Sequence, residues 1–146
     1  MGDSVKIHFQ LQQDEDGYPP VAAESIWALP GSHANEYVVD NVPFFERDAT
    51  LGDIILARKE DGNLWFEKVA RRSENSLIRI TFFDRGMVEK VCNSLAALGC
   101  VTEALKQYNL VAVSIPANIN LSDVQAYLQD QARAGTIDYE EAILRQ

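Results

Sequence analysis

The sequence predicts an α+β protein built from two parts, and three observations lead to this prediction. Alternation of apolar and polar residues, typical of strands, runs through the first half, where helical spacing is absent. Two stretches with apolar residues at helical spacing occur, and both lie in the second half. No linker rich in Gly, Pro or Ser separates the halves, so we expect the two parts to pack tightly together.

The first part, residues 1–75, is expected to hold about five short strands and no helix. A strand that begins at Glu36 should stop near Pro43, because proline cannot donate to a ladder. The Asp61-Gly62 pair between two strand-like runs is a strong hairpin signal. The expected strands cover residues 5–12, 21–29, 36–45 and both arms of a hairpin over 53–72. Short strands in this order are typical of a small β-barrel or a curled antiparallel sheet.

The second part, residues 76–146, changes period. Its first helix should end at Gly99, and its second should begin at Asn120 or Ser122 and end at Gly135. Strands are expected over 76–84, 100–107 and 110–116, helices over 86–99 and 120–135, and a strand or short helix over 136–145. The resulting β-α-β-β-α-β order predicts a ferredoxin-like unit.

Charge and composition limit the classes of partner. Hydrophobic residues make up 47% of the chain, and the net charge is −9. No apolar run approaches the ~20 residues of a membrane-spanning helix, and the N-terminus lacks a signal-peptide layout, so we expect a cytoplasmic protein without a membrane partner. Residues 1–57 carry ten acidic and two basic residues. That excess disfavours nucleic acid and favours a basic protein partner.

No metal site, disulfide or cofactor is predicted. Cys92 and Cys100 would lie roughly 12 Å apart on one helix, which is too far for a disulfide. Besides these two thiols, only His8 and His33 could join a zinc site. Three adjacent acids at positions 14–16 point in different directions in a loop, which makes them weak metal ligands.

The sequence also lacks a recognisable catalytic motif, and we expect a protein that is not an enzyme. It holds neither a G-x-S-x-G elbow nor a phosphate-binding G-x-x-x-x-G-K-[ST] loop. Glu24 lies between apolar residues of a strand and is expected to be buried. A structural ion pair with Arg47, Arg58 or Arg79 is favoured over an acid/base role for this carboxylate, although an enzyme with Glu24 or an Asp as base stays open.

Several short motifs in one order resemble a family of bacterial proteins of unknown function, DUF4265. They are Tyr18-Pro19-Pro20, Glu24-Ser25-x-Trp27, Asn41-x-Pro43-Phe44-Phe45, Gly52-Asp53 and Arg79. Small acidic members of this family resemble immunity proteins encoded beside secreted toxins. Apart from any such role, we expect Trp27 to pack in the core between the two parts and Asn41 to hold a turn.

The resemblance and the charge together suggest an immunity-type inhibitor. It would occlude the basic active cleft of a cognate toxin of the ADP-ribosyltransferase or nuclease class. Because like charges repel, the clustered acids at 14–16 should gain nothing for the fold, which makes them candidates for the partner surface. The expected partner-binding residues are Asp14, Glu15, Asp16, Tyr18, Glu60, Asp61, Asp138, Tyr139, Glu140 and Glu141. The alternative is a small-molecule-sensing regulatory module that uses the ferredoxin-like part.

Overall fold

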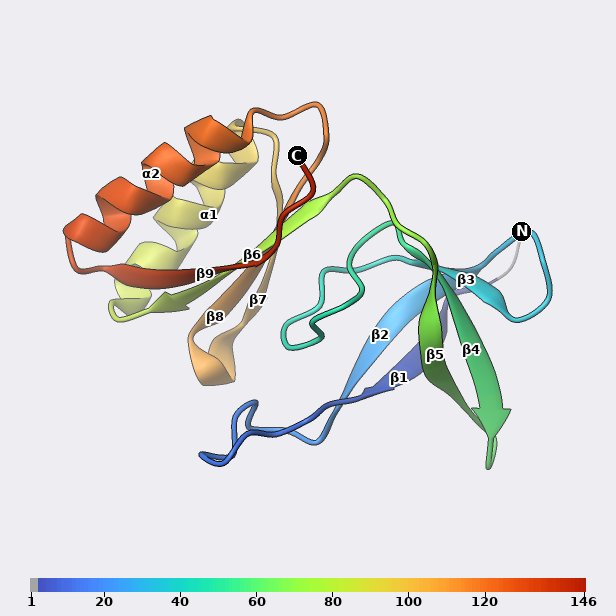
Figure 1. Ribbon diagram of the computed structural model, residues 1–146. Coiled ribbons are helices and arrows are strands. Elements are labelled where there is room, and N and C mark those ends of the chain that lie inside the picture. Colours follow the sequence, from blue (N-terminus) through green and yellow to red (C-terminus); the bar gives the residue numbers. More distant parts are fainter. Residues whose placement is uncertain (1–2) are drawn as a thin grey trace. The chain divides into compact units, whose positions relative to one another are not determined.

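The computed structural model describes residues 3–146 as two compact units (Figure 1). Unit 1 ends at Ser73 and unit 2 covers Glu74–Gln146, whereas the expected boundary lies two residues later. Both sheets and both helices agree with the predicted α+β class. The tight packing of the two parts on each other stays a prediction.

Unit 1 contains five strands and, within its described residues, no helix. Its strands are β1 (Val5–Gln10), β2 (Ala23–Pro30), β3 (Glu36–Val39), β4 (Ile54–Glu60) and β5 (Asn63–Arg71). Consecutive strands pair antiparallel, and β5 returns to β1 in a short parallel pairing at Ile7 and Leu64, so the pairings form a closed ring. The two-residue turn at Asp61-Gly62 confirms the predicted hairpin, with φ of 51° and 83°.

The core of unit 1 follows from the alternation of its strands. Phe9 stacks on Phe66 with ring centroids 4.4 Å apart, while Trp65, the neighbour of Phe66, lies on the other face 5.3 Å from the His8 ring. The fully buried apolar residues of this core are Ile7, Phe9, Ile26, Ala28, Val39, Ala49, Ile55 and Ala57. Successive side chains of a strand point to opposite faces, so residues two positions apart share the inward face.

The expected burial of Trp27 in a core is wrong. Its side chain is 47% exposed. Ile26 and Ala28 take the inward positions of β2, so the pleat turns Trp27 to the opposite face. There the ammonium of Lys6 lies 5.1 Å from the indole centroid, at a distance typical of a cation–π contact.

The strand that was expected to reach Pro43 ends at Val39, and residues 40–53 follow as a segment without regular structure. Val42, Phe45 and Ala49 of this segment are buried. A long irregular segment with buried backbone needs side chains to satisfy its amide groups.

Unit 2 places two helices on one face of a four-stranded antiparallel sheet (Figure 1). Its elements are β6 (Ser76–Phe82), α1 (Val88–Ala97), β7 (Val101–Leu105), β8 (Leu110–Ile115), α2 (Leu121–Arg133) and β9 (Ile137–Ile143). Short 3₁₀ turns cover Arg85–Met87 and Lys106–Tyr108. The sheet order is β7-β8-β6-β9. The C-terminal segment, for which the sequence predicts either a strand or a short helix, forms a strand.

Local signals set the ends of the helices in unit 2. The Asn120 side chain accepts a hydrogen bond from the Ser122 amide at 2.9 Å, as an N-cap does, which confirms the first of the two expected caps. At Gly99, with φ of 101°, an added Cβ would lie 2.4 Å from the Ile119 side chain, so only glycine fits there. No helix in residues 3–146 is long and apolar enough to cross a membrane.

Both cysteines of unit 2 are free, as expected. Cys100 is buried in the apolar core beneath the helices, and Cys92 is half-buried. Burial raises the pKa of the Cys100 thiol to about 11. A thiol with so high a pKa is mostly protonated at neutral pH and therefore unreactive.

Candidate functional site

The buried carboxylate of Glu24 organises the segment that borders the site. It accepts hydrogen bonds from three consecutive backbone amides, those of Phe44 (2.6 Å), Phe45 (2.9 Å) and Glu46 (2.9 Å). The side chain is 9% exposed. Among the described residues of unit 1, neither Arg47 nor Arg58 has a nitrogen within 4.0 Å of this carboxylate, so the predicted ion pair with either of them is wrong. Three charge-assisted hydrogen bonds from backbone amides compensate the burial of this carboxylate as well as an ion pair would.

Two further motif residues hold the same segment. Asn41 Oδ1 accepts from the Trp27 amide at 2.7 Å and ties the start of the segment to β2, across the chain rather than within a turn. The fully buried Asp53 accepts from the Thr50 amide (3.0 Å) and the Ser73 amide (2.8 Å). The polar residues of the family motifs thus serve the backbone of residues 40–53 and fix its course through unit 1.

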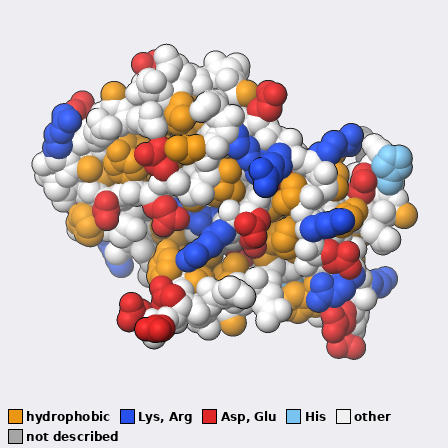
Figure 2. Space-filling view, viewed as in Figure 1, with side chains coloured by type: hydrophobic (Ala, Val, Ile, Leu, Met, Phe, Trp, Pro, Cys, Tyr) orange, Lys and Arg blue, Asp and Glu red, His pale blue; other side chains and the backbone are white. Residues whose placement is uncertain are grey.

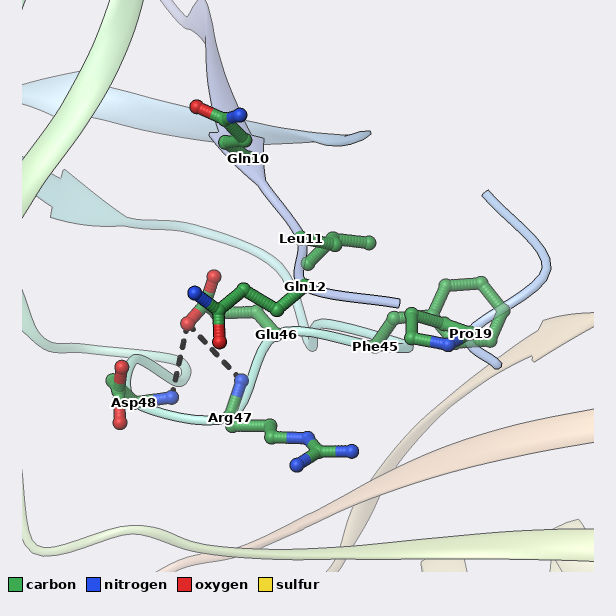
Figure 3. Close-up of a pocket in the computed structure, with 8 residues that line it drawn as sticks. All are labelled: Gln10, Leu11, Gln12, Pro19, Phe45, Glu46, Arg47 and Asp48. Atoms are coloured by element: carbon green, nitrogen blue, oxygen red, sulfur yellow. Dashed lines mark hydrogen bonds between the residues drawn. The ribbon is translucent and has the colours of Figure 1, made fainter. Parts of the chain in front are cut away.

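Glu46 brings a second buried carboxyl group to this segment. Its Oε1 accepts from the amides of Arg47 and Asp48, each at 3.0 Å (Figure 3). The side chain is 5% exposed. Burial raises the pKa of this carboxyl above its ordinary 4.5, and the nearby charges of Asp48 and Glu24 raise it further, although the two amide hydrogen bonds oppose the shift.

A groove of about 170 Å³ lies where the end of β1 meets the 45–48 segment. Figure 3 shows the apolar Leu11, Phe45 and Pro19 toward one end and Glu46 with Asp48 toward the other. The lining residues are Gln10, Leu11, Gln12, Pro19, Phe45, Glu46, Arg47 and Asp48. The groove therefore offers an apolar end and a polar end to one incoming side chain.

The acidic loop between β1 and β2 borders this groove, and Asp14 fixes its shape. Asp14 Oδ1 accepts from the amides of Asp16 and Tyr18, each at 2.9 Å, and the Asp14 amide donates to the Tyr18 carbonyl at 2.7 Å. The expectation that all three acids gain nothing for the fold is therefore wrong for Asp14. Glu15 and Asp16 are exposed at the tip that Asp14 shapes.

Tyr18 links the acidic loop to the groove. Its ring meets Phe45 edge-on with centroids 6.2 Å apart, and its side chain is 47% exposed. Pro19, which follows it, lines the groove. Tyrosine is one of the residue types enriched among the few residues that dominate the binding energy of protein interfaces.

The β4–β5 hairpin forms a second acidic tip of unit 1. Figure 2 shows acidic side chains gathered at both the β1–β2 loop and this hairpin. Glu60 Oε2 lies 3.3 Å from Arg58 Nε, with both side chains about half exposed, and Asp61 is exposed in the turn. The local ion pair leaves Asp61 as the clearer source of negative charge at this tip.

The remaining predicted contacts belong to β9 of unit 2 and form a separate set. Glu140 lies 3.9 Å from Arg79, and Glu141 accepts from the Gln125 side chain at 2.7 Å. Asp138 accepts from the Tyr139 amide at 2.9 Å, while Tyr139 packs against the core of unit 2. These side chains have partners within unit 2, so they are weaker candidates for a partner surface than Glu15 and Asp16.

Sequence reasoning missed the groove itself. Gln10 and Gln12 look like solvent-facing polar residues, and nothing in the sequence marks Glu46 as buried. The available signal was the apolar Phe44-Phe45 pair directly before Glu46, which draws the chain inward. Across residues 3–146, no group of three His, Cys, Asp or Glu side chains is placed to hold a metal ion.

Comparisons with known proteins find a family of unknown function and a solved structure of similar fold. The model of a family described as "Domain of unknown function (DUF4265)" matches residues 24–139. A solved structure described as "Novel crystal structure of a hypothetical protein from Neisseria gonorrhoeae" is similar, with a TM-score of 0.78 and 20% identity over 100% of this chain and 97% of that chain. At that identity the likeness is one of fold. No curated protein matches the chain.

Proposed function

The chain belongs to the family described as Domain of unknown function (DUF4265), and we propose that this member is an immunity-type protein that binds and occludes the active cleft of a secreted bacterial toxin. The toxin would belong to the ADP-ribosyltransferase or nuclease class. Such enzymes bind phosphate-bearing substrates, and a cleft for phosphates is usually basic.

The observation that carries the proposal is the acidic tip of the β1–β2 loop. Asp14 fixes the backbone there, so Glu15 and Asp16 project from a loop of defined shape. A loop whose backbone is already held in place loses less conformational entropy when a partner binds. The repulsion between neighbouring carboxylates is relieved when a basic surface covers them.

The groove beside the tip supports the proposal as an anchor site. A long basic side chain from the partner would lay its methylene groups against Phe45 and Leu11 and bring its charge toward Asp48. Tyr18 would cover the contact from the side of the loop. Aromatic and charged residues around one small pocket are typical of the few residues that dominate an interface.

The charge distribution supports fast association with a basic partner. Ten acidic residues and two basic residues lie in positions 1–57, which include the loop and the groove. Opposite fields steer partners together and raise association rates, most strongly at low salt. The hairpin acids Glu60 and Asp61 would extend the same field, and the β9 acids would act as a secondary contact.

The proposal also includes the finer architecture and the compartment. We place unit 1 among small β-barrels, a reading that the closed ring of pairings supports, and unit 2 among ferredoxin-like units, which the order β7-β8-β6-β9 supports. We place the protein in the cytoplasm, where toxins that act on nucleic acid or NAD would meet their substrates, and we assign it no catalytic role.

Co-expression with the toxin encoded beside this gene tests the proposal. Wild-type protein should relieve the growth arrest that the toxin causes. Reversal of the tip charges by Glu15→Lys with Asp16→Lys should abolish that relief, since Asp14 keeps the loop in shape. The matched control is Asp3→Lys with Glu67→Lys, which changes the net charge equally at exposed positions elsewhere in unit 1.

Three results of this experiment would each reject a different part of the proposal. Growth arrest that persists beside soluble wild-type protein would reject the immunity function. Relief that survives the tip reversal would reject the loop as the contact. Equal loss with both double variants would show that net charge acts without a defined surface.

A further inference from the structure

Unit 2 contains a cavity that the proposed function does not use. It lies between the start of α1 and the turn that joins β7 to β8, and its volume is about 160 Å³. Its apolar lining consists of Val88, Ala104, Leu110 and Val111. The turn is held in place, because the Phe82 amide donates to the Asn109 carbonyl at 2.9 Å and the Asn109 amide to the Lys106 carbonyl at 3.1 Å.

Two cations line the same cavity. Arg85 comes from the 3₁₀ turn before α1, and Lys106 comes from the turn after β7. Among the residues of unit 2, 74–146, no carboxylate oxygen lies within 4.0 Å of either cation. Asp84, which precedes Arg85, accepts a hydrogen bond from the Gly86 amide at 2.9 Å.

Arg85 and Lys106 give this cavity a positively charged side, although the protein carries a net charge of −9. The two cations come from separate turns and line one apolar cavity. Asn109 adds an amide group to the polar lining. An apolar pocket with a few convergent polar groups is the usual form of a small-molecule site.

We propose that this cavity binds small monocarboxylates with an apolar body. The carboxylate lies between Arg85 and Lys106, and the apolar body packs on Val88, Leu110 and Val111. Arginine suits a carboxylate because its planar donors match the two oxygens. The size agrees, since an engineered apolar cavity of ~150 Å³ holds one benzene ring. This site is independent of the toxin contact proposed for unit 1.

Titration of the full-length ¹⁵N-labelled protein with sodium benzoate tests the proposal. Saturable shifts should appear at the amides of residues 85–88 and 104–111, with a Kd in roughly the millimolar range or tighter. Benzamide, the neutral isostere, and inorganic phosphate, which lacks an apolar body, should each bind at least about fivefold more weakly. Rising salt should weaken benzoate binding.

Variants assign the two halves of the site. Arg85→Gln and Lys106→Gln should each weaken benzoate binding about threefold to tenfold, while Lys90→Gln, an exposed lysine of α1 outside the cavity lining, should not. Ala104→Leu should fill the cavity and block binding while the remaining spectrum is kept.

Four outcomes would overturn the proposal. They are no saturable shift, shifts elsewhere in the chain, equal binding of benzamide or phosphate, and a double Arg85→Gln, Lys106→Gln variant that binds as wild type does.

Discussion

Removal of the Glu24 carboxylate should destabilise unit 1 more than any other single loss of an acidic group there. Three hydrogen bonds of 2.6–2.9 Å end on this group, and two of the three donor amides, those of Phe45 and Glu46, are buried. An unsatisfied buried amide costs about 1–3 kcal/mol. Because such costs do not add fully, Glu24→Ala should lower the free energy of unfolding by about 3–5 kcal/mol.

Glu24→Gln removes the negative charge of the side chain but keeps its shape. The amide oxygen of glutamine can still accept from Phe45 and Glu46, but its NH₂ group then faces the Phe44 amide, donor against donor. We expect the free energy of unfolding to fall by about 2 kcal/mol, so that the stability of this variant lies between those of wild type and Glu24→Ala. The control is Glu15→Gln at the exposed tip, which should stay within about 0.5 kcal/mol of wild type.

Tryptophan fluorescence is a selective probe for these variants. The chain has two tryptophans, Trp27 and Trp65, and both belong to unit 1. Urea titrations followed by fluorescence therefore report the unfolding of unit 1 without a signal from unit 2. If Glu24→Ala and Glu24→Gln both unfold within about 0.5 kcal/mol of wild type, the carboxylate does not hold the segment as described.

Three further predictions follow from burial and capping. Burial raises the pKa of Glu46, so the folded protein holds this proton more tightly than the unfolded chain and loses stability as pH rises from 4.5 through the raised pKa. Glu46→Gln should therefore be more stable than wild type at pH 7 and equal to it below pH 4.5. A Glu46→Gln variant that is less stable than wild type at pH 7 would contradict this prediction. Iodoacetamide at pH 8 should alkylate the half-buried Cys92 well before Cys100, whose pKa is about 11, and equal rates by mass spectrometry would contradict the burial of Cys100. Asn120→Ala should lower the stability of unit 2 by about 1 kcal/mol in urea titrations followed by circular dichroism, which both helices of unit 2 dominate, whereas no change would deny the N-cap its role.

The sequence predicts the strands and helices of this protein well, because each rests on a local signal. Alternation in β1 places Ile7 and Phe9 inward, and Asp61-Gly62 supplies the two left-handed positions that a tight hairpin needs. Asn120 is recognisable as a cap because its side chain bonds within its own turn. The same alternation places Trp27 outward, next to Ile26, although its size suggests a core residue.

The site depends on contacts between distant segments, which the sequence does not show. Glu24 is recognisable in the sequence as a charge among apolar residues, but its partners are backbone amides twenty or more positions away. Every residue except proline has such an amide, so the sequence does not show which amides the carboxylate will bond. Asp14 looks identical to Glu15 and Asp16 until the loop closes on it. The burial of Glu46 likewise follows only from the course of residues 40–53.

The affinity of the protein for its purified, catalytically inactive toxin partner tests the central claim most directly. The claim is that Glu15 and Asp16 form a specific contact on the loop shaped by Asp14. Calorimetric titration at low salt should show at least about tenfold weaker binding for Glu15→Lys with Asp16→Lys, a loss of about 1.4 kcal/mol. The control Asp3→Lys with Glu67→Lys should lose less than about threefold. Equal affinities for the two double variants would contradict the claim.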